Sequence, residues 1–315
     1  MKHFLSLNDL PNFEQTLALA KQLKADPYAH ETAGKRKTLG LLFFNPSLRT
    51  RLSTQKAAQQ LGFSTMVMNF SNEAWALEFE DGTEMRGIRS EHVREAAAVV
   101  SQYCDMVAIR AFASLTDKDQ DEAEIVLKSF AQFASIPVIN MESAVGHPLQ
   151  ALADAITLDE HPTKHKPKVV LSWAPHPKAL PHAVANSFTK MMEFRDADFV
   201  ITQPEGYELD PRITKNVPVI HDQEEALKDA DFVYVKNWCS YSNYGSILRT
   251  DDEWMLTQDK MKLTNNAKFM HCLPVRRNIV VADGVLDHPN SLVIDQANNR
   301  TFAAQAVLKT LLDNG

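Results

Sequence analysis

Short apolar runs that alternate with longer helical patterns restrict the fold of this 315-residue chain more than any other feature of its sequence. The runs lie at 39–44, 65–70, 106–112, 137–141, 168–173, 199–202, 218–221, 232–237, 269–273 and 291–295. They are continuous rather than alternating in polarity, which is typical of strands that are covered on both faces. Helical spacing lies between them at 50–62, 92–103, 121–135 and 182–195. We therefore predict an α/β protein with two doubly wound parallel sheets, one in each half of the chain.

Composition excludes several classes of function. The chain has a formal net charge of −7 and a pI near 5.9, so it lacks the basic surface that nucleic-acid or anionic-membrane binding requires. No apolar run approaches the roughly 20 residues that span a bilayer, and the N-terminus is too polar for a signal peptide. Three distant cysteines without a CxxC pair favour a reducing compartment. We thus expect a cytoplasmic protein without nucleic-acid or membrane partners.

Glycine and histidine patterns lack the common cofactor and metal motifs. The ten glycines include no pair two residues apart, which excludes GxGxxG, and no GxxxxGK[ST] stretch occurs either. His176 and His182 are six residues apart, and Pro162 separates His161 from His165, so neither pair has the spacing of a helical metal site. We therefore expect neither a cofactor nor a bound metal.

A turn suited to anion binding follows the first apolar run, in the stretch SLRTR that starts at Ser47. The first amides of a helix have no internal partner, and here Ser47 and Thr50 add hydroxyl groups while Arg49 adds a bidentate fork. A serine N-cap followed by solvated arginines is the plain alternative. Because ligands collect beyond the carboxyl ends of strands in α/β sheets, the position favours a phosphate site. Arg300, near the last helix, is either a further anion ligand or a surface arginine.

Further polar groups follow strands in the first half of the chain. Arg110 comes at the end of one apolar run, and Glu142, His147 and Gln150 follow the next. Arg110 could form a structural ion pair, and His147 could simply cap a helix. If both follow strands of one sheet, Arg110 faces the same crevice as Arg49, and the imidazole of His147 is placed to polarise a carbonyl group.

The second half also places polar residues after strand candidates, namely His176, Lys236, Cys272, Leu273 and Arg276. Cys272 could act as a nucleophile, although a buried and unreactive thiol is the simpler interpretation. The Leu-Pro pair after it predicts an unusual turn, whose backbone carbonyls could face a ligand amide.

Taken together, these residues resemble those of the transcarbamylase family, which includes the aspartate and ornithine carbamoyltransferases. The stretches SLRTR, HPLQ and HCLPVRRN, with Arg110 and Arg300, occur in the family's order and approximate spacing over essentially the whole chain. The resemblance implies two α/β domains, at 1–147 and 148–295, and a C-terminal helix at 296–315 that returns to the first domain. It also implies a homotrimer with active sites shared between subunits.

The resemblance implies that carbamoyl phosphate is the donor substrate. Its phosphate would be bound by Ser47, Leu48, Arg49, Thr50 and Arg300. Its carbonyl group would be polarised by the implied catalytic residues Thr50, Arg110 and His147. Its amine would be held by Gln150 and by the backbone around Cys272 and Leu273. Trp75 would reach the phosphate bound in the neighbouring subunit.

The acceptor implied by the resemblance is an acylated amino acid. The chain lacks the SMG loop of ornithine carbamoyltransferases, and its WAPHP, KNW and CLPVRRN stretches are similar to the branch that acts on N-acylated ornithine. In that branch the chain is knotted around the proline-rich loop. Glu142 would bind the amino-acid part of the acceptor, and its carboxylates would be bound by His176, Lys236 and Arg276.

One extra carboxylate distinguishes N-succinylornithine from N-acetylornithine. In the acetyl branch a glutamate would repel that carboxylate, whereas the succinyl branch usually has proline at the same place. Ser90 aligns there, and it is small and neutral, with Arg89 beside it. A like-charge clash in a partly dry site would cost on the order of several kcal/mol, so Ser90 favours the succinyl substrate. A shift of one position would place Glu91 there and favour acetyl.

The sequence thus predicts transfer of the carbamoyl group of carbamoyl phosphate to the δ-amine of N2-succinylornithine. The products would be N-succinylcitrulline and phosphate, in arginine biosynthesis. N-acetylornithine carbamoyltransferase is the alternative within the family. The alternative outside it is a non-catalytic phosphate-binding regulatory module, which would bind the donor without releasing phosphate.

Overall fold

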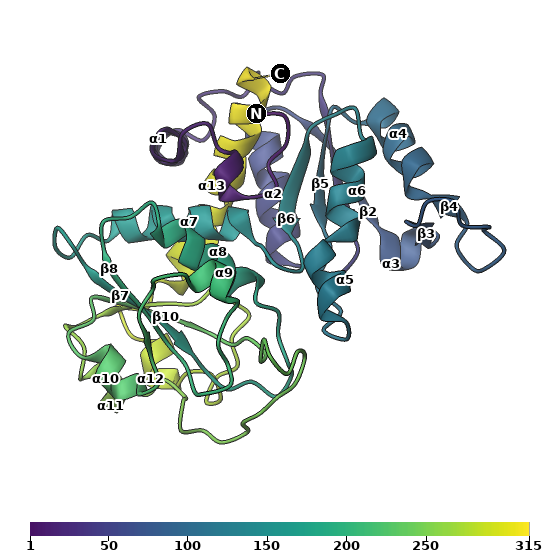
Figure 1. Cartoon of the computed structure of the whole chain (residues 1–315). Coiled ribbons are helices and arrows are strands. Elements are labelled where there is room, and N and C mark those ends of the chain that lie inside the picture. The colour runs from purple at the N-terminus through teal and green to yellow at the C-terminus, as the bar shows by residue number, and fades with distance from the viewer. Residues whose placement is uncertain (315) are drawn as a thin grey trace. The chain divides into compact units, whose positions relative to one another are not determined.

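The computed structural model describes residues 1–314, and the chain forms two compact units (Figure 1). The first unit contains residues 1–114, 119–152 and those from Asn299 on, and the second contains 115–118 and 153–298. Two of the four borders fall inside long helices, α7 (Pro148–Glu160) and α13 (Val293–Asp313). The return of the C-terminal helix to the first unit is therefore confirmed.

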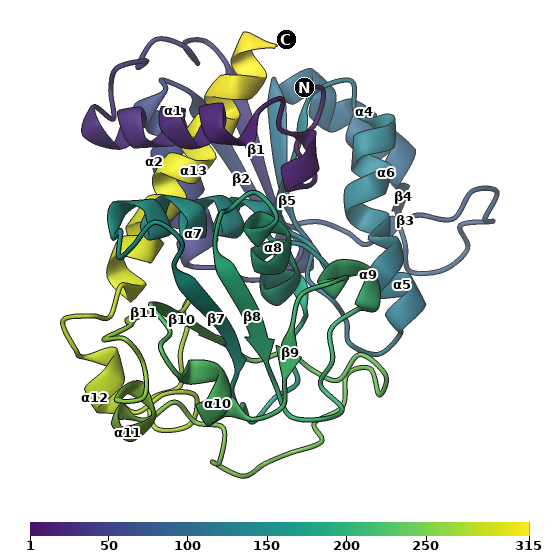
Figure 2. The same ribbon diagram turned by 60° about the vertical axis from the view of Figure 1, so that its left-hand side comes forward.

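A four-stranded parallel sheet forms the centre of the first unit, in the order β2-β1-β5-β6. Its strands are β1 (Thr38–Phe43), β2 (Ser64–Asn69), β5 (Met106–Arg110) and β6 (Val138–Glu142). One face carries α1 (Phe13–Ala25), α2 (Arg49–Gln60) and α13, and the other carries α4 (Val93–Tyr103) and α6 (Ile125–Phe133) (Figures 1 and 2). The short elements are η1 (Leu7–Asp9), α3 (Phe70–Glu73), β3 (Leu77–Glu78), β4 (Glu91–His92) and α5 (Lys118–Ala123).

A five-stranded parallel sheet forms the centre of the second unit, in the order β11-β10-β7-β8-β9. Its strands are β7 (Lys168–Trp173), β8 (Asp198–Thr202), β9 (Val219–Ile220), β10 (Phe232–Lys236) and β11 (Lys268–Met270). The helices are α8 (Ala183–Met192), α9 (Pro211–Thr214), α10 (Gln223–Leu227), α11 (Gln258–Met261) and α12 (Asp283–Leu286). Figure 2 shows β7, β8 and β9 side by side.

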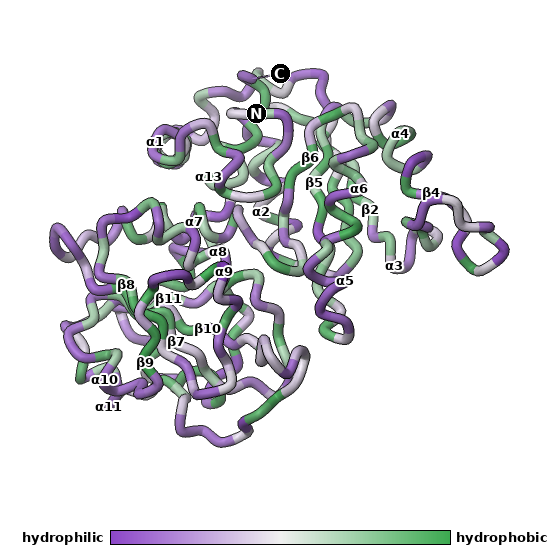
Figure 3. The backbone as a smooth tube through the Cα atoms, in the orientation of Figure 1, coloured by the Kyte–Doolittle hydropathy of each residue, from purple (hydrophilic) through white to green (hydrophobic). Residues whose placement is uncertain are grey.

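Each sheet buries apolar side chains on its faces, and Figure 3 shows these hydrophobic segments in β5, β6, β7 and β10. In the first unit, Ile109 and Val138 pack with Phe130 of α6. In the second, Tyr234 packs edge-on against Phe188 of α8, with ring centroids 4.5 Å apart. Burial of such large side chains contributes about 1.5–3 kcal/mol each, which makes both sheets rigid supports for the loops at their ends.

The last apolar run, at 291–295, is not a strand as predicted. Ser291 makes only an isolated bridge with Phe269, and α13 begins at Val293. A short apolar run fits either a buried strand or the first turn of a helix, and the long helical pattern that follows decides here. The other predicted strands are present, with ends shifted by at most three residues.

Strand β2 also differs from the prediction, because it is not covered on both faces. Its side chains alternate between exposed and half-buried, and Met66 and Met68 are 54% and 42% exposed. It lies at one edge of the sheet, whereas β6 at the other edge is buried along its length. In residues 1–314, no helix combines the length and apolarity needed to cross a lipid bilayer.

Candidate active site

Three of the predicted motifs lie at one end of the sheet in the first unit. Strands β1, β5 and β6 are parallel neighbours, so their carboxyl ends meet at the same edge. The turn before α2 follows β1, Arg110 is the last residue of β5, and Glu142 is the last residue of β6. The fold therefore gathers motifs that are far apart in the sequence.

The SLRTR motif forms the N-terminus of α2. Leu48 is the N-cap residue, and no side chain caps the helix, so Ser47 is not the N-cap. Thr50 is buried, whereas Ser47 and Arg49 are half-buried and Leu48 is exposed. The first amides of this 12-residue helix are thus free of a side-chain cap, at the end where the helix dipole favours an anion.

Arg300, which lies on α13, connects this turn to His147. Its guanidinium is buried and donates from Nη2 to the Thr50 hydroxyl at 2.6 Å. The same nitrogen lies 3.3 Å from Nε2 of His147, which accepts a hydrogen bond when the imidazole carries its proton on Nδ1. Arg300 is therefore not a surface arginine but part of a buried polar cluster.

Arg110 forms the second half of this cluster. Its Nε and Nη2 lie 3.1 and 3.0 Å from Oε2 of Glu142, and both side chains are buried. Its Nη1 donates to the carbonyls of Asn45 and Pro46 at 3.2 and 2.9 Å. Arg110 thus forms the predicted ion pair and, in addition, holds the turn that precedes α2.

Glu142 and His147 complete the arrangement. Nε2 of the imidazole lies 3.6 Å from Oε2 of Glu142, an ion pair only when the imidazole is protonated. The backbone carbonyl of His147 accepts from the amides of Gln150 and Ala151, so the backbone caps α7 and the side chain faces the cluster. Gln150 is buried in the first turn of α7.

The charges of this cluster favour an anion. Arg110 and Arg300 supply two buried guanidinium groups, and that of Arg110 is paired with the carboxylate of Glu142. Arg49 adds a half-buried guanidinium at the start of α2. Guanidinium groups are suited to the oxygen atoms of a phosphate.

Trp75 and Ser90 lie outside the cluster. Trp75 is 58% exposed, and its Nε1 donates to Oε2 of Glu91 at 2.7 Å. Ser90 is exposed, and its amide donates to the carbonyl of Ala76 at 3.1 Å. In residues 1–314, no hydrogen bond joins either residue to Arg300 or its neighbours. Both belong to the connection around β3 and β4, which projects from the sheet of its unit (Figures 1 and 2).

In the second unit, the structure brings His176 and Arg276 together. Nε of Arg276 donates to Nε2 of His176 at 3.2 Å, while Nδ1 of the imidazole contacts the backbone of Lys178. Burial lowers the pKa of His176, and the charges of Lys236 and Arg276 lower it further. Lys236 ends β10, and its carbonyl accepts from the amide of Ala174, at the start of the proline-rich loop. His176 and these cations thus form a half-exposed group suited to carboxylates.

Cys272 and Leu273 lie in the turn that follows β11, before Arg276. Cys272 is buried, as its plain interpretation predicted. Leu273 has a left-handed backbone, with φ +56°, and the peptide bond from Leu273 to Pro274 is cis. Nδ1 of His271 accepts a hydrogen bond from the Leu273 amide at 2.8 Å. The unusual turn predicted for the Leu-Pro pair is therefore confirmed.

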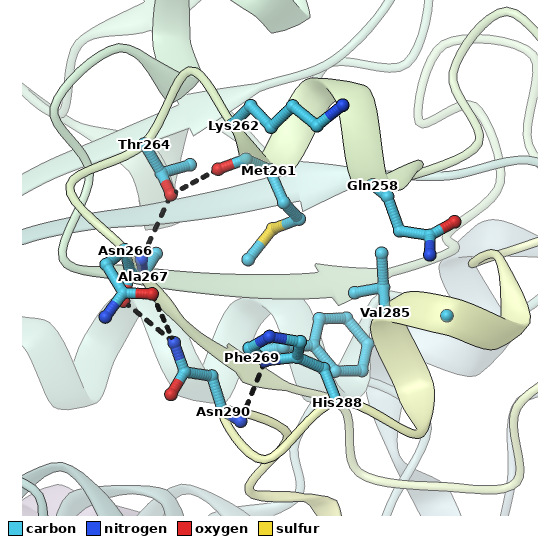
Figure 4. Close-up of a pocket in the computed structure, with 11 residues that line it drawn as sticks. Gln258, Met261, Lys262, Thr264, Asn266, Ala267, Phe269, Val285, His288 and Asn290 are labelled. Atoms are coloured by element: carbon cyan, nitrogen blue, oxygen red, sulfur yellow. Dashed lines mark hydrogen bonds between the residues drawn. The ribbon is translucent and has the colours of Figure 1, made fainter.

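A separate cavity of about 440 Å³ lies beside the start of β11 (Figure 4). Met261, Phe269 and Val285 form its apolar wall, and Thr264 and Asn290 are among its polar residues. None of the residues predicted to bind substrate lines it. In residues 1–314, no group of three or more His, Cys, Asp or Glu side chains is arranged to hold a metal ion.

Sequence reasoning missed the residues that hold the cluster in place. Oδ1 of Asn45 accepts from the amide of Phe112 at 2.6 Å, which fixes the turn before α2 against the chain after β5. Ser143 bonds both Gly146 and Asn140, and so shapes the loop that leads to His147. Nothing in the sequence identified hydrogen-bond partners this distant.

Family models match nearly the whole chain. The carbamoyl-P binding domain of aspartate/ornithine carbamoyltransferase matches residues 2–160, and the Asp/Orn binding domain of the same proteins matches residues 181–311.

Curated relatives and solved structures match along their full length. The chain is 48% identical over 315 residues to N-succinylornithine carbamoyltransferase of Bacteroides thetaiotaomicron, which is 99% of each chain. It is 38% identical over 335 aligned positions to N-acetylornithine carbamoyltransferase of Xanthomonas campestris, covering 99% of this chain and 98% of the relative. A crystal structure of a glutamate-to-serine variant of N-acetyl-L-ornithine transcarbamylase, complexed with carbamyl phosphate and N-succinyl-L-norvaline, superposes with a TM-score of 0.93. That structure is 37% identical, and the match covers 99% of this chain and 100% of that one.

Proposed function

Because the chain belongs to the aspartate/ornithine carbamoyltransferase family, we propose that it transfers the carbamoyl group of carbamoyl phosphate to the δ-amine of N2-succinylornithine. The observation that carries this proposal is the buried contact of Arg300 with Thr50 and His147, beside the pair formed by Arg110 and Glu142. This cluster offers cationic and neutral donors to a phosphate and to a carbonyl oxygen in one unit of the protein. A carbamoyltransferase that uses N-acylated ornithine is what the relatives support in common.

The geometry of the first unit supports most of the donor-binding roles that we propose. Ser47, Arg49, Thr50, the amides around Leu48 and the guanidinium of Arg300 bind the phosphate. Arg110 and His147, with the hydroxyl of Thr50, donate to the carbonyl oxygen of the carbamoyl group, where negative charge develops. Removing one such donor typically costs about 3–4 kcal/mol of transition-state stabilisation. Gln150 and the backbone of Cys272 and Leu273 bind the carbamoyl amine.

The proposed reaction is an addition followed by an elimination. The lone pair of the neutral δ-amine forms a bond to the carbamoyl carbon, and the carbonyl electrons move to oxygen to give a tetrahedral oxyanion. The bond from carbon to the bridging oxygen then breaks, and phosphate leaves with its electron pair. Because an alkyl amine has a pKa of about 10.4 in water, it must be bound in its neutral form before it attacks. After the addition its nitrogen carries a positive charge, and we assign the proton that it then loses to the leaving phosphate. Holding both substrates in register supplies further acceleration.

The acceptor-binding roles fall mainly to the second unit. His176, Lys236 and Arg276 bind carboxylates, because the cations are half-buried or exposed and the imidazole is in contact with one of them. Glu142 binds the amino-acid part of the acceptor. These groups would bind an acylated amino acid whether the acyl group is acetyl or succinyl.

Three observations favour succinyl over acetyl. Identity is 48% to the N-succinylornithine carbamoyltransferase and 38% to the N-acetylornithine enzyme. Ser90 is exposed and uncharged, whereas the carboxylate of Glu91 is held by the indole of Trp75. The related transcarbamylase in which a glutamate is replaced by serine was crystallised with N-succinyl-L-norvaline. A small neutral residue at position 90 leaves room for the extra carboxylate.

We also propose that the protein is a homotrimer in which Trp75 reaches a neighbouring active site. Leu48, Met66, Met68 and Trp75 are all more than 40% exposed in the first unit, which supports burial by another copy. Sedimentation of the purified protein tests this directly, because a monomer would leave these side chains in water.

Phosphate release with three amines tests the proposed reaction. We expect release with N-succinylornithine, at least 10-fold less with N-acetylornithine, and almost none with ornithine. Preference for N-acetylornithine would replace the substrate but keep the family reaction. Binding of carbamoyl phosphate without release for any amine would instead indicate a regulatory module.

Substitution of Ser90 tests the basis of the acyl preference. Ser90→Glu should lower kcat/KM for N-succinylornithine about 10- to 100-fold, because a like charge in a partly dry site costs about 1–3 kcal/mol. The rate with N-acetylornithine should change much less. Ser90→Gln, which has similar size but no charge, is the matched control and should retain succinyl use. Equal losses in both variants would show that size rather than charge decides.

A further inference from the structure

The turn that contains Leu273 is fixed by a hydrogen bond from its own amide. That amide donates to Nδ1 of His271 at 2.8 Å, while the residue keeps a left-handed backbone with φ +56°. In residues 1–314, no protein donor reaches the Leu273 carbonyl, so this acceptor is available to a ligand. A β-carbon at positive φ is sterically unfavourable, so the turn needs support from its surroundings.

That support comes from a buried chain of hydrogen bonds. The amide of His271 donates to Oε1 of Gln296 at 2.9 Å, and Nε2 of Gln296 donates to Oδ1 of Asp154 at 2.7 Å. Asp154 and Gln296 are completely buried, and His271 is 2% exposed. They come from α7, α13 and the loop after β11, all within the second unit. The chain thus connects two helices to the residue that holds Leu273.

The chemistry of the two ends determines which side chain fits in the middle. A backbone N–H can only donate, and an ionised carboxylate can only accept, so the central group must accept at one end and donate at the other. The primary amide of Gln296 does both, and its orientation is fixed by its partners. A carboxylate at this position would face that of Asp154, and an apolar side chain would remove the partner of the His271 amide and one of the partners of Asp154.

The buried end of the chain continues toward Cys272. Burial raises the pKa of Tyr234 well above its usual value, and the charges of Asp154 and Cys272 raise it further. The phenol therefore remains neutral beside them. Polar groups buried this deeply, in contact with the segment proposed to bind substrate, do more than complete a core, since an apolar core would be simpler to build.

We propose that Asp154 and Gln296 are positioning residues that, through His271, hold the Leu273 carbonyl where it accepts a hydrogen bond from the amine of the carbamoyl group. This inference rests on the proposed function, which assigns the backbone of Cys272 and Leu273 to that amine. The two residues touch neither substrate. They act by keeping one carbonyl in place before the donor binds, which reduces the reorganisation that binding would otherwise require.

Ligand binding with and without an amine tests the proposal. Phosphonoacetamide carries the phosphonate and the amide of the donor, whereas inorganic phosphate lacks the amide. In Gln296→Glu, we expect the Kd for phosphonoacetamide to rise at least 10-fold and the Kd for phosphate to stay within 2-fold of wild type. The ratio of the two dissociation constants is therefore the readout, because general damage to the fold would raise both.

The double variant Asp154→Asn with Gln296→Glu restores a donor opposite an acceptor. The new amide at 154 can donate to the new carboxylate, whose second oxygen still accepts from the His271 amide. We expect the ratio of dissociation constants to return to within 3-fold of wild type, and kcat/KM for carbamoyl phosphate to recover with it. A double variant no better than Gln296→Glu would overturn the proposal, because independent sites add rather than compensate.

Two further variants keep the test informative if Gln296→Glu folds poorly. His271→Asn retains a hydrogen-bond acceptor near the position of Nδ1, whereas His271→Leu does not. Only His271→Leu should therefore weaken the binding of phosphonoacetamide without weakening that of phosphate. Val233→Ala, a buried change elsewhere in the second unit, controls for lost stability and should leave the ratio unchanged. If wild type releases no phosphate, the proposed function is rejected. If wild type turns over normally but the ratio of dissociation constants is unchanged in Gln296→Glu and His271→Leu, only the positioning role is rejected.

Discussion

The two units offer their polar groups in different ways. In the first unit, Arg110, Arg300 and His147 are buried and bonded to partners on other elements. In the second, Arg276 is exposed and His176 and Lys236 are half-buried, on loops and at a strand end. A phosphate has a fixed shape and can be bound by a rigid buried cluster. An acyl group that varies between relatives is better bound by exposed side chains, because replacing such side chains costs little stability.

The largest effect is expected from Arg110→Met, which should damage both activity and stability. The change leaves the buried carboxylate of Glu142 without its cationic partner, and breaking such a pair costs about 3–5 kcal/mol. It also frees the carbonyls of Asn45 and Pro46, and so loosens the turn before α2. Urea unfolding should show the lost stability, and kcat/KM should fall about 10³-fold or more.

The double variant Arg110→Met with Glu142→Gln is the control for the buried charge. It should recover much of the stability lost in the single variant, but not the activity. Equal instability of both variants would show that packing, rather than the unpaired carboxylate, is responsible.

Arg300→Met should separate activity from stability. The contacts of Arg300 include the hydroxyl of Thr50 and the imidazole of His147. We expect kcat/KM to fall about 10³-fold, because a proposed phosphate ligand is lost, while the free energy of unfolding falls by less than about 2 kcal/mol. A decrease of more than about 2 kcal/mol in the free energy of unfolding would show that Arg300 also stabilises the fold, which would contradict this prediction.

A smaller and more selective effect is expected from Arg276→Gln in the second unit. An exposed side chain contributes little to folding, so stability should stay within about 0.5 kcal/mol of wild type. KM for the acylated ornithine should rise about 10- to 100-fold, and KM for carbamoyl phosphate should remain the same, because the lost cation is the one that we propose to bind a carboxylate of the acceptor. Steady-state kinetics with each substrate varied in turn measure this split, and an equal rise in both would remove the distinction between the units.

The smallest effect concerns the pH dependence of stability at His176. Burial and the charges of Lys236 and Arg276 lower its pKa in the folded protein below the ordinary 6.5. Below pH 6.5 the unfolded chain therefore binds a proton that the folded chain does not, and wild type loses stability from this group as the pH falls toward the lowered value. His176→Gln, which cannot titrate, should lose less stability than wild type between pH 7 and 5.5. Parallel curves for the two proteins in urea unfolding would show that the imidazole does not contribute.

Much of the fold was predictable because a short apolar run is a local property of the sequence. Nine of the ten apolar runs became strands, since each run and its flanking turn signals are contained within a few residues. The exception, at Val293, shows the limit, because the same residues fit a strand or the first turn of a helix until the rest of α13 is packed. The exposure of Met66 and Met68 on β2 likewise depends on how the strands and helices pack, because β6 at the other edge of the sheet is buried.

The sequence by itself determined where functional side chains can lie. It specifies two parallel α/β units in which arginines, hydroxyls and histidines come directly after strands. Parallel strands bring their carboxyl ends to one edge, so the motif positions alone indicated which residues could meet. Tertiary structure decided which of them touch. Arg300 reaches Thr50 across 250 positions, and Gln296 reaches Asp154 across 142. Such contacts arise from the packing of whole helices on a sheet, a long-range property that no local pattern of residues specifies.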